Sequence, residues 1–430
     1  MRKFILIAFT ALFSSAIWAQ NVLEELKADF DKAGSNYYAY PEPKDPLTPA
    51  PRDKKPFYIS HYGRHGSRYL IHYREYDYPY ATLKYAWERG KLSERGQKVF
   101  REVNLLREES EKRLGELTPL GAQQHQGIAN RMYQRFPEVF EGDVCIEAKS
   151  TIVIRCIISM QNALQKLMSL NPALRITSDA SEHDMYYMNF QDLPLARKRW
   201  SKEANDAYNA YSRKHARHEE PMLRLFNDSA FAWDNININR LNQDMFKMAS
   251  SVQGTRHAAD FSLFRDLYTD EELYQNWKQA NAYWYIAFGS SPLNGGTQPF
   301  GQRNLLRKII AEADSCIALP KPGATLRFGH ETIVLPLTCL LGLNGFDQQV
   351  TDLEELESRG WINYKVFPMA ANIQFIFYRK TPQDDDVLIK VLLNENETTL
   401  PIASDCAPYY HWKDFKDFYL KKLADYKEER

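Results

Sequence analysis

The chain has 430 residues, 44% of them hydrophobic, and its 55 Lys and Arg side chains are balanced by 55 Asp and Glu side chains. This length suits two or three domains, or one large α/β body with an insertion. A formal net charge of zero argues against a general nucleic-acid binder or a polybasic membrane binder, so local positive charge must meet any anionic substrate.

The N-terminus predicts a secretory signal peptide at 1–19. It has a basic start, an apolar run from Phe4 to Trp18, and a small residue, Ala19, before the expected cleavage. An anchor helix left uncut is the alternative, but the apolar run is short for a membrane span. We therefore expect a periplasmic or secreted protein with no membrane span in its mature chain.

A β-rich run from Phe57 to Ser60 leads into the sequence Arg64-His65-Gly-Ser-Arg68, and a helix is expected to start near Ser67. Guanidinium groups can bind phosphate oxygens bidentately, and a helix N-terminus adds positive charge beside them. These features predict a phosphate pocket with His65 as a nucleophile. A solvated turn is the alternative that so short a match leaves open.

The following segments are expected to be two helical regions and then a strand, a loop and a helix. Apolar spacing predicts surface helices within 78–114, and Thr118-Pro119 is typical of the start of a further helix. Alternation from Val144 to Ala148 predicts a strand, with Arg155 near the start of the next helix. An arginine there is usually solvated, but it could also be a second phosphate clamp. Another strand is expected at 174–178.

Residues 185–299 contain many aromatic side chains in helical segments and almost no strand-like alternation. We interpret them as an all-helical domain inserted into an α/β core made of 20–184 and 300–430. The aromatic side chains are more often core than ligand platform.

The α/β pattern then resumes. The expected elements are a helix at 303–318, a strand at 325–328, a helix at 333–343, strands within 363–380 and at 387–393, and a helix from 412. His330 and Glu331 lie between a strand and a helix, as His65 does, and two such loops open on one side of a sheet. The expected fold class is α/β, with a central mixed sheet flanked by helices and an inserted all-helical domain.

Metal and cofactor chemistry have weak support in the sequence, so none is expected. A zinc-protease interpretation of His330-Glu331 lacks the second histidine, because position 334 is Val. The five cysteines show no C-x-x-C spacing, and their odd number leaves at least one unpaired. They are Cys145, Cys156, Cys316, Cys339 and Cys406.

Four motifs in order resemble those of the histidine phosphatase superfamily. They are Arg64-His-Gly-Ser-Arg68, Leu117-Thr-Pro-Leu-Gly121 with Gln124, Arg155 with Ser159, and His330-Glu331-Thr332. The chain is most similar to the acid phosphatase and phytase branch, and within it to the multiple inositol polyphosphate phosphatases. The resemblance covers the mature chain and implies a phosphoglycerate-mutase-like sheet with a helical insert.

The resemblance also implies the role of each site residue. His65 would take the phosphoryl group as a phosphohistidine, and Glu331 would protonate the leaving alkoxide and then assist water. The phosphate oxygens would be held by Arg64, Arg68, Arg155 and His330.

Two positions depart from the family pattern. Phytases of this branch usually carry His-Asp and the animal inositol polyphosphate enzymes His-Ala-Glu, whereas here Glu331 directly follows His330. The longer glutamate would reach more than one phosphate position and relax positional choice. Cys156 stands where the family usually has Thr, which puts a local hydrogen bond in doubt but not Arg155.

The implied substrates are small anions, inositol hexakisphosphate and lower inositol phosphates. Further cations would have to surround the cleft, and the candidates Arg52–Lys55, Arg197–Arg199 and Arg213–Arg217 are each more often solvated surface groups. Two alternatives stay open: a broad-specificity acid phosphatase acting on sugar phosphates, and a catalytically decayed phosphate-ligand binding protein. The intact site residues argue against decay.

Overall fold

The computed structural model describes residues 22–43, 45–217 and 219–427. The predicted signal peptide at 1–19 lies outside these residues. Within the described ranges no helix is long and apolar enough to cross a membrane. The described chain begins with a helical segment at 22–28, followed by the 3₁₀ helix η1 (Phe30–Tyr37).

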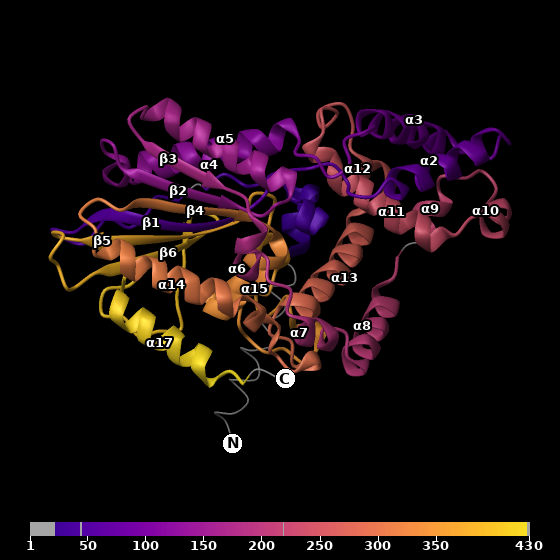
Figure 1. Ribbon diagram of the computed structural model, residues 1–430. Coiled ribbons are helices and arrows are strands. Elements are labelled where there is room, and N and C mark those ends of the chain that lie inside the picture. The colour runs from indigo at the N-terminus through magenta and orange to yellow at the C-terminus, as the bar shows by residue number, and fades with distance from the viewer. Residues whose placement is uncertain (1–21, 44, 218, 428–430) are drawn as a thin grey trace, which may run out of the picture.

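A mixed β-sheet forms the centre of the molecule (Figure 1). Its strands are β1 (Lys55–Arg64), β2 (Cys145–Ser150), β3 (Arg175–Asp179), β4 (Gly323–Gly329), β5 (Asn372–Arg379), β6 (Leu388–Leu393), β7 (Asn396–Glu397) and β8 (Tyr410–His411). The order is β3-β2-β4-β1-β5-β6-β7, and β8 pairs with β6. The first four strands in this order are parallel, and the others are antiparallel to their neighbours. The predicted mixed sheet is confirmed.

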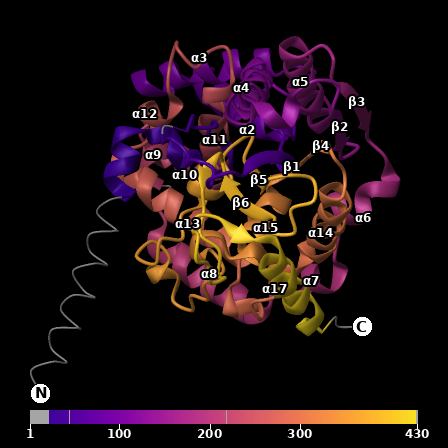
Figure 2. The same cartoon turned by 90° about the vertical axis from the view of Figure 1, so that its left-hand side faces the viewer.

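Helices cover both faces of this sheet (Figure 2). One face carries α4 (Pro119–Arg135) and α5 (Ile154–Leu170), and the other carries α14 (Arg303–Ile317), α15 (Glu331–Leu341) and α17 (Trp412–Asp425). Successive side chains of a strand point to opposite faces. Ile59 and Ile376 therefore belong to the core under α4 and α5, whereas Tyr58 and Phe375 belong to the core under α14, α15 and α17.

The described part of 185–299 is helical and lies beyond one end of the sheet (Figure 1). Its helices are α6 (Met185–Met188), α7 (Leu193–Lys198), α8 (Lys202–His215), α9 (Glu219–Leu223), α10 (Ser229–Asn235), α11 (Ile238–Ser251), α12 (Leu263–Leu267) and α13 (Asp270–Phe288). α11 packs against α2 (Arg74–Trp87), and α12 packs against α3 (Glu94–Glu109). Helices α2 and α3, which precede the predicted insert in the sequence, therefore pack into the same hydrophobic core as the insert. The domain boundaries at 185 and 299 stay a prediction.

Short elements connect the main ones. They are η2 (Pro137–Phe140), η3 (Glu182–Asp184), η4 (Val252–Gly254), η5 (Pro292–Asn294), η6 (Gln298–Gln302), η7 (Leu343–Gly345), η8 (Leu353–Glu355) and α16 (Asn363–Val366). The last of these corrects the prediction of strands from 363 onward, because β5 begins only at Asn372. Asn363 is held by tertiary contacts instead: its amide oxygen accepts from Trp277 Nε1 at 3.0 Å, and its backbone N–H donates to Asn281 at 2.9 Å.

The predicted start of α4 is confirmed, but the prediction of a helix start near Ser67 is wrong. The Thr118 side chain accepts a hydrogen bond from the Gly121 N–H, and Pro119 is the first helical residue. Ser67 lies instead in a bend next to Arg68, which pairs with Leu117 in an isolated β-bridge, and the next helix, α2, starts only at 74. Hydrogen bonds from α4 to this segment replace those that a helical turn would have made.

Candidate active site

The site forms where three parallel strands end side by side. Arg64, the last residue of β1, is opposite Gly329, the last residue of β4, and Ser150 at the end of β2 is opposite Phe328. The loops after these strands carry His65, His330 with Glu331, and Arg155. Carboxyl ends of parallel strands are the usual place for ligand sites in α/β folds.

His65 is fully buried, and its contacts determine which ring nitrogen carries the proton. Nδ1 lies 2.9 Å from the carbonyl oxygen of Gly66. A carbonyl can only accept, so Nδ1 must donate, and Nε2 keeps its lone pair. Nε2 has no hydrogen-bond partner in the described part of the chain and lies 3.7 Å from Glu331 Oε2.

The pKa of His65 lies well below its ordinary value of 6.5, because burial and the nearby charges of Arg64, Arg155 and Arg68 all disfavour an imidazolium. His65 is therefore neutral at physiological pH. A neutral, buried imidazole with a free Nε2 lone pair is chemically suited to nucleophilic attack.

Three arginines surround His65 and keep N–H groups available. Arg64 Nη1 donates to the carbonyls of Asn36 and Phe367 at 2.6 and 3.0 Å. Arg68 Nη1 donates to its neighbour's carbonyl at 3.0 Å. Arg64 Nη2, Arg68 Nε and Arg155 Nε are buried donors without a partner among the described residues. Buried unpaired donors are costly, so this group is suited to a ligand rich in acceptors, such as phosphate.

Glu331 is the first residue of α15, and its Oε2 lies 3.1 Å from Arg64 Nε. Burial alone would raise the pKa of this carboxyl, but Arg64, Arg68 and His330 lower it to about 2. Glu331 is therefore ionised in the absence of a ligand. The N-terminus of α15 supplies here the positive helix-dipole charge that was expected from a helix starting near Ser67.

His330 precedes Glu331 as the cap residue of α15 and is also neutral. Burial and the neighbouring arginines lower its pKa to about 4, although Glu331 opposes this shift. Its Nε2 lies 3.2 Å from the hydroxyl of Thr151. The residue in doubt from the sequence, Cys156, is a free thiol that donates to the Gly329 carbonyl at 3.2 Å. Cys156 therefore makes a local hydrogen bond of its own, with sulfur as the donor.

The loop that carries His65 is held by residues from α4 and α5. Ser67 N donates to Gln124 at 2.8 Å, and Thr118 N donates to the Ser67 carbonyl at 2.9 Å. Gly66 N donates to Ser159 Oγ at 3.2 Å. A Cβ on Gly66 would lie 2.3 Å from the carbonyl oxygen of Gly121, so only glycine allows this close approach. Thr118, Gln124 and Ser159 belong to the sequence motifs but had no predicted role. In the structure they hold the loop that carries His65 in place.

The ligand atoms of His65, His330 and Glu331 lie within 4.8 Å of one another, a spacing that a metal ion could use. The surrounding charge disfavours a bound metal ion. The positive charges of Arg64 and Arg155 lower the pKa of His65, and they would repel a metal cation at the same place. An anion is the better fit to the electrostatics of this site.

A cleft of 820 Å³ is lined by Tyr37, which contacts one of the three arginines. The hydroxyl of Tyr37 is 3.4 Å from Arg68 Nη1, and its ring stacks under that guanidinium. The cleft is also lined by Arg213 from α8 and Lys247 from α11. Of the three groups of basic residues proposed from the sequence, the group at 213–217 contributes Arg213 to this cleft. The sequence did not identify Tyr37 and Lys247 as cleft residues, because no local pattern distinguishes them.

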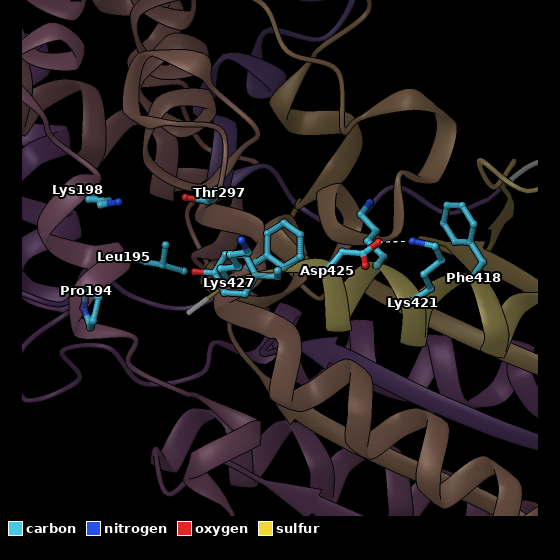
Figure 3. Close-up of a pocket in the computed structure, with 11 residues that line it drawn as sticks. Pro194, Leu195, Lys198, Thr297, Phe418, Lys421, Asp425 and Lys427 are labelled. Carbon is cyan, nitrogen blue, oxygen red and sulfur yellow. Dashed lines mark hydrogen bonds and ion pairs between the residues drawn. The ribbon is translucent and has the colours of Figure 1, made fainter. Parts of the chain in front are cut away.

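A different, more apolar pocket of 650 Å³ lies at the end of α17 (Figure 3). It is lined by Leu195, Phe300 and Phe418 together with lysines, and Lys421 pairs there with Asp425. It contains none of the residues assigned to the phosphate site.

The family model of the histidine phosphatase superfamily (branch 2) matches residues 63–394. Multiple inositol polyphosphate phosphatase 1 of Dictyostelium discoideum is 28% identical over 111 residues, which span 25% of this chain and 17% of the length of that curated relative.

Solved structures share the fold. The multiple inositol polyphosphate phosphatase of Bifidobacterium longum in complex with phosphate has a TM-score of 0.76 at 17% identity, over 91% of this chain and 98% of that chain. Its complex with inositol hexasulfate gives 0.73 at 19% identity, over 90% and 97%. The phytase from D. castellii gives 0.62 at 14% identity, over 92% and 86%. These likenesses show the fold and agree with the predicted fold class.

Proposed function

Because the chain belongs to the histidine phosphatase superfamily (branch 2), we propose that it is a phosphomonoesterase that hydrolyses inositol hexakisphosphate and lower inositol phosphates. The observation that carries the proposal is the partnerless Nε2 of buried His65, beside Glu331 and three arginines. Nucleophile, proton donor and phosphate clamp all come from the chain itself, so the proposed reaction uses no cofactor.

In the first proposed step, His65 Nε2 attacks phosphorus. An N–P bond forms, the bond from phosphorus to the inositol oxygen breaks, and its electron pair goes to that oxygen. The Glu331 carboxylic acid protonates the oxygen, so inositol leaves as an alcohol. The phosphoryl oxygens are held by Arg64, Arg68, Arg155 and His330.

In the second proposed step, water attacks the phosphorus of the phosphohistidine. Glu331, now a carboxylate, accepts a proton from this water, and the N–P bond breaks with its electron pair returning to Nε2. Inorganic phosphate is released. The 3.7 Å between His65 Nε2 and Glu331 Oε2 supports a shared role at one phosphorus atom.

Glu331 must be protonated when the leaving group departs, although its pKa is about 2 in the ligand-free chain. A bound phosphate neutralises the arginines that lower this pKa, and it adds negative charge beside the carboxyl. Both effects raise the pKa of Glu331. The rate of the first step should therefore fall as the pH rises above the pKa of Glu331 in the substrate complex.

Two cations that line the cleft, Arg213 and Lys247, support a substrate with several phosphates, and Lys247 Nζ also lies 3.0 Å from Glu75 Oε1 in the same cleft. When one phosphate occupies the arginine clamp, others on the same ring extend into the space beside Tyr37, within reach of walls that include Arg213 and Lys247. The Bifidobacterium longum neighbour, which binds phosphate and inositol hexasulfate in its complexes, motivates the choice of inositol as the carrier.

A substrate panel tests the proposal. Phosphate release is measured for inositol hexakisphosphate, a sugar phosphate and an aryl phosphate, with product isomers resolved. The highest kcat/KM on inositol hexakisphosphate is expected. Release from the other two substrates alone would instead identify a broad-specificity acid phosphatase, and binding without any release would identify a decayed phosphate-binding protein.

We also propose that residues 1–19 direct export to the periplasm or the medium and are then removed, as the basic and apolar pattern of the N-terminus suggests. Mass spectrometry of the protein from its host should find Gln20 at the N-terminus of the exported fraction. An intact Met1 in a membrane fraction would replace this proposal with the anchor helix.

A further inference from the structure

A second cluster of metal-ligating side chains lies between the turn at 404–409 and strand β8. Asp405, Cys406 and His411 place a carboxylate oxygen, a thiol sulfur and a ring nitrogen within 4.8 Å of one another. The cluster shares no residue with the phosphate site, and the reaction proposed above does not use it.

The two ring nitrogens of His411 have different neighbours, and Nε2 is the one that faces Asp405. Nδ1 lies 2.6 Å from Asp386 Oδ1, and Nε2 lies 3.2 Å from Asp405 Oδ1. In a neutral ring that donates from Nδ1, the Nε2 lone pair points toward Asp405. Metal-binding histidines almost always donate their other N–H to a carboxylate, a backbone carbonyl or water.

The spacing also suits a tetrahedral ion. Zinc bonds to nitrogen and oxygen of about 2.0 Å separate two ligand atoms by about 3.3 Å in a tetrahedron. The observed 3.2 Å between His411 Nε2 and Asp405 Oδ1 is close to this separation.

The outer carboxylate is itself held in place. Lys54 Nζ lies 3.1 Å from Asp386 Oδ2 and 2.9 Å from Asp384 Oδ2. The backbone N–H of Asp386 donates to Asp384 Oδ1 at 3.1 Å. These bonds orient the group that in turn orients the ring of His411.

The backbone under the three ligand groups is also ordered. β8 pairs with β6, which anchors His411 to the central sheet. The turn before it is closed by a hydrogen bond from Tyr409 N to the Cys406 carbonyl at 3.0 Å and by Ser404 Oγ donating to the Tyr409 carbonyl at 2.5 Å. The contacts of the Cys406 sulfur are long: it lies 3.5 Å from that same carbonyl and 3.7 Å from Ser404 Oγ.

The local charge favours a cation. Asp384, Asp386 and Asp405 are carboxylates, and the ammonium of Lys54 is the cation in contact with the first two. Zinc binding requires a neutral His411 ring, and the three carboxylates and Lys54 then carry a net negative charge that a divalent ion would neutralise.

We propose that Asp405, Cys406 and His411 bind a zinc ion, with Asp386 holding His411 in the binding tautomer and solvent as the fourth ligand. A mixed set of sulfur, nitrogen and oxygen suits zinc, whereas magnesium and calcium prefer oxygen alone. On binding, the S–H bond of Cys406 breaks, its proton goes to the buffer, and a Zn–S bond forms. The ion joins the turn to β8 and braces the start of α17.

An imidazolium that donates to both Asp386 and Asp405 would explain the contacts of His411 without a metal. That arrangement makes no use of the Cys406 sulfur. The thiolate is therefore the group whose behaviour separates the two explanations.

The full mature chain, stripped of metal with a chelator, is titrated separately with Zn²⁺, Co²⁺ and Mg²⁺. One Zn²⁺ per chain, a thiolate-to-cobalt charge-transfer absorption, and no Mg²⁺ binding at the same concentrations are expected. The substitution Cys406→Ser should abolish the absorption and weaken zinc binding at least tenfold. Asp386→Asn should keep the absorption but weaken binding about 10- to 100-fold.

Cys145→Ser, which removes a half-buried thiol on β2, is the matched control and should change neither result. The cobalt spectrum of the unmodified chain tests the proposal even if Cys406→Ser does not fold. No charge-transfer absorption, or equal zinc affinity with and without Cys406, would overturn it. So would zinc binding that survives Cys406→Ser and is lost in His65→Ala, because that result assigns the ion to the phosphate site.

Discussion

Two regions of this molecule gather histidine beside a carboxylate, yet they are suited to ligands of opposite charge. His65, His330 and Glu331 are buried within a ring of arginines, whereas His411 and Asp405 lie at the surface among further aspartates. Both sets place their ligand atoms within 4.8 Å. The difference shows that residue type and spacing do not decide what such a cluster binds; the surrounding charge and the degree of burial do.

The substitution that should separate the two regions most strongly is His65→Ala. Loss of the nucleophile should lower kcat on inositol hexakisphosphate on the order of 10⁴-fold or more, while zinc binding at His411 stays unchanged. Steady-state phosphate release and a zinc titration check both expectations. His183→Ala, an exposed histidine, is the control, and unchanged activity of His65→Ala would remove His65 as the nucleophile.

Glu331→Gln should show whether the carboxylate in the arginine ring works as an acid. We expect a loss of about 10²- to 10⁴-fold on inositol phosphates, whose alkoxide leaving groups need a proton, and a much smaller loss on aryl phosphates. Rapid-quench measurement of phosphoenzyme formation compares the two. Equal losses on both substrates would contradict the proton-donor role.

The same carboxyl should also affect acid stability. Its folded-state pKa of about 2 is below the ordinary 4.5, so its stabilisation is fully present above about pH 4.5 and is lost as the pH falls toward 2. The shift corresponds to about 3 kcal/mol at most. Urea unfolding should therefore find Glu331→Gln less stable than the parent chain at pH 7, by an amount that shrinks below pH 4.5.

Glu203→Gln, an exposed carboxyl on α8, should show no such pH-dependent gap. If Glu331→Gln were as stable as the parent at pH 7, the arginines would not be holding the carboxyl ionised. That result would weaken the electrostatic contrast between the two clusters.

Arg213→Ala tests how far the positive region extends along the cleft. Loss of one charged hydrogen bond should raise KM for inositol hexakisphosphate about tenfold and leave KM for an aryl phosphate unchanged. Arg197→Ala, an exposed arginine that does not line the cleft, is the comparison. Equal changes for the two variants would show that Arg213 acts only through general surface charge.

The smallest effect is expected from metal removal. A chelator should leave phosphate release unchanged, because the arginine ring disfavours a cation, and should lower the Tm by only a few degrees by emptying the proposed zinc site. Thermal unfolding with and without chelator measures this shift, and Cys406→Ser should not show it. Loss of activity on chelation would mean that the phosphate site itself uses a metal.

Much of the fold could be predicted because its signals are local. Thr118 and Pro119 mark the start of α4, alternation near Val144 marks strand β2, and the strand expected at 387–393 is β6. The prediction of a helix start at Ser67 was wrong because the Ser67 N–H donates its hydrogen bond to the side chain of Gln124, which is distant in the sequence. Asn363 was misassigned for the same reason, since its partners are about 80 residues away on α13.

The sequence by itself determined which residues are candidates for the proposed chemistry, because His65, Arg155 and Glu331 each stand beside a strand end or helix start that local pattern reveals. Only the tertiary structure decided how they work together. The proton on Nδ1 of His65 depends on the Gly66 carbonyl, and the low pKa of Glu331 depends on Arg64, more than 260 positions earlier. Charge and hydrogen-bond geometry act through space, so no reading along the chain could have supplied them.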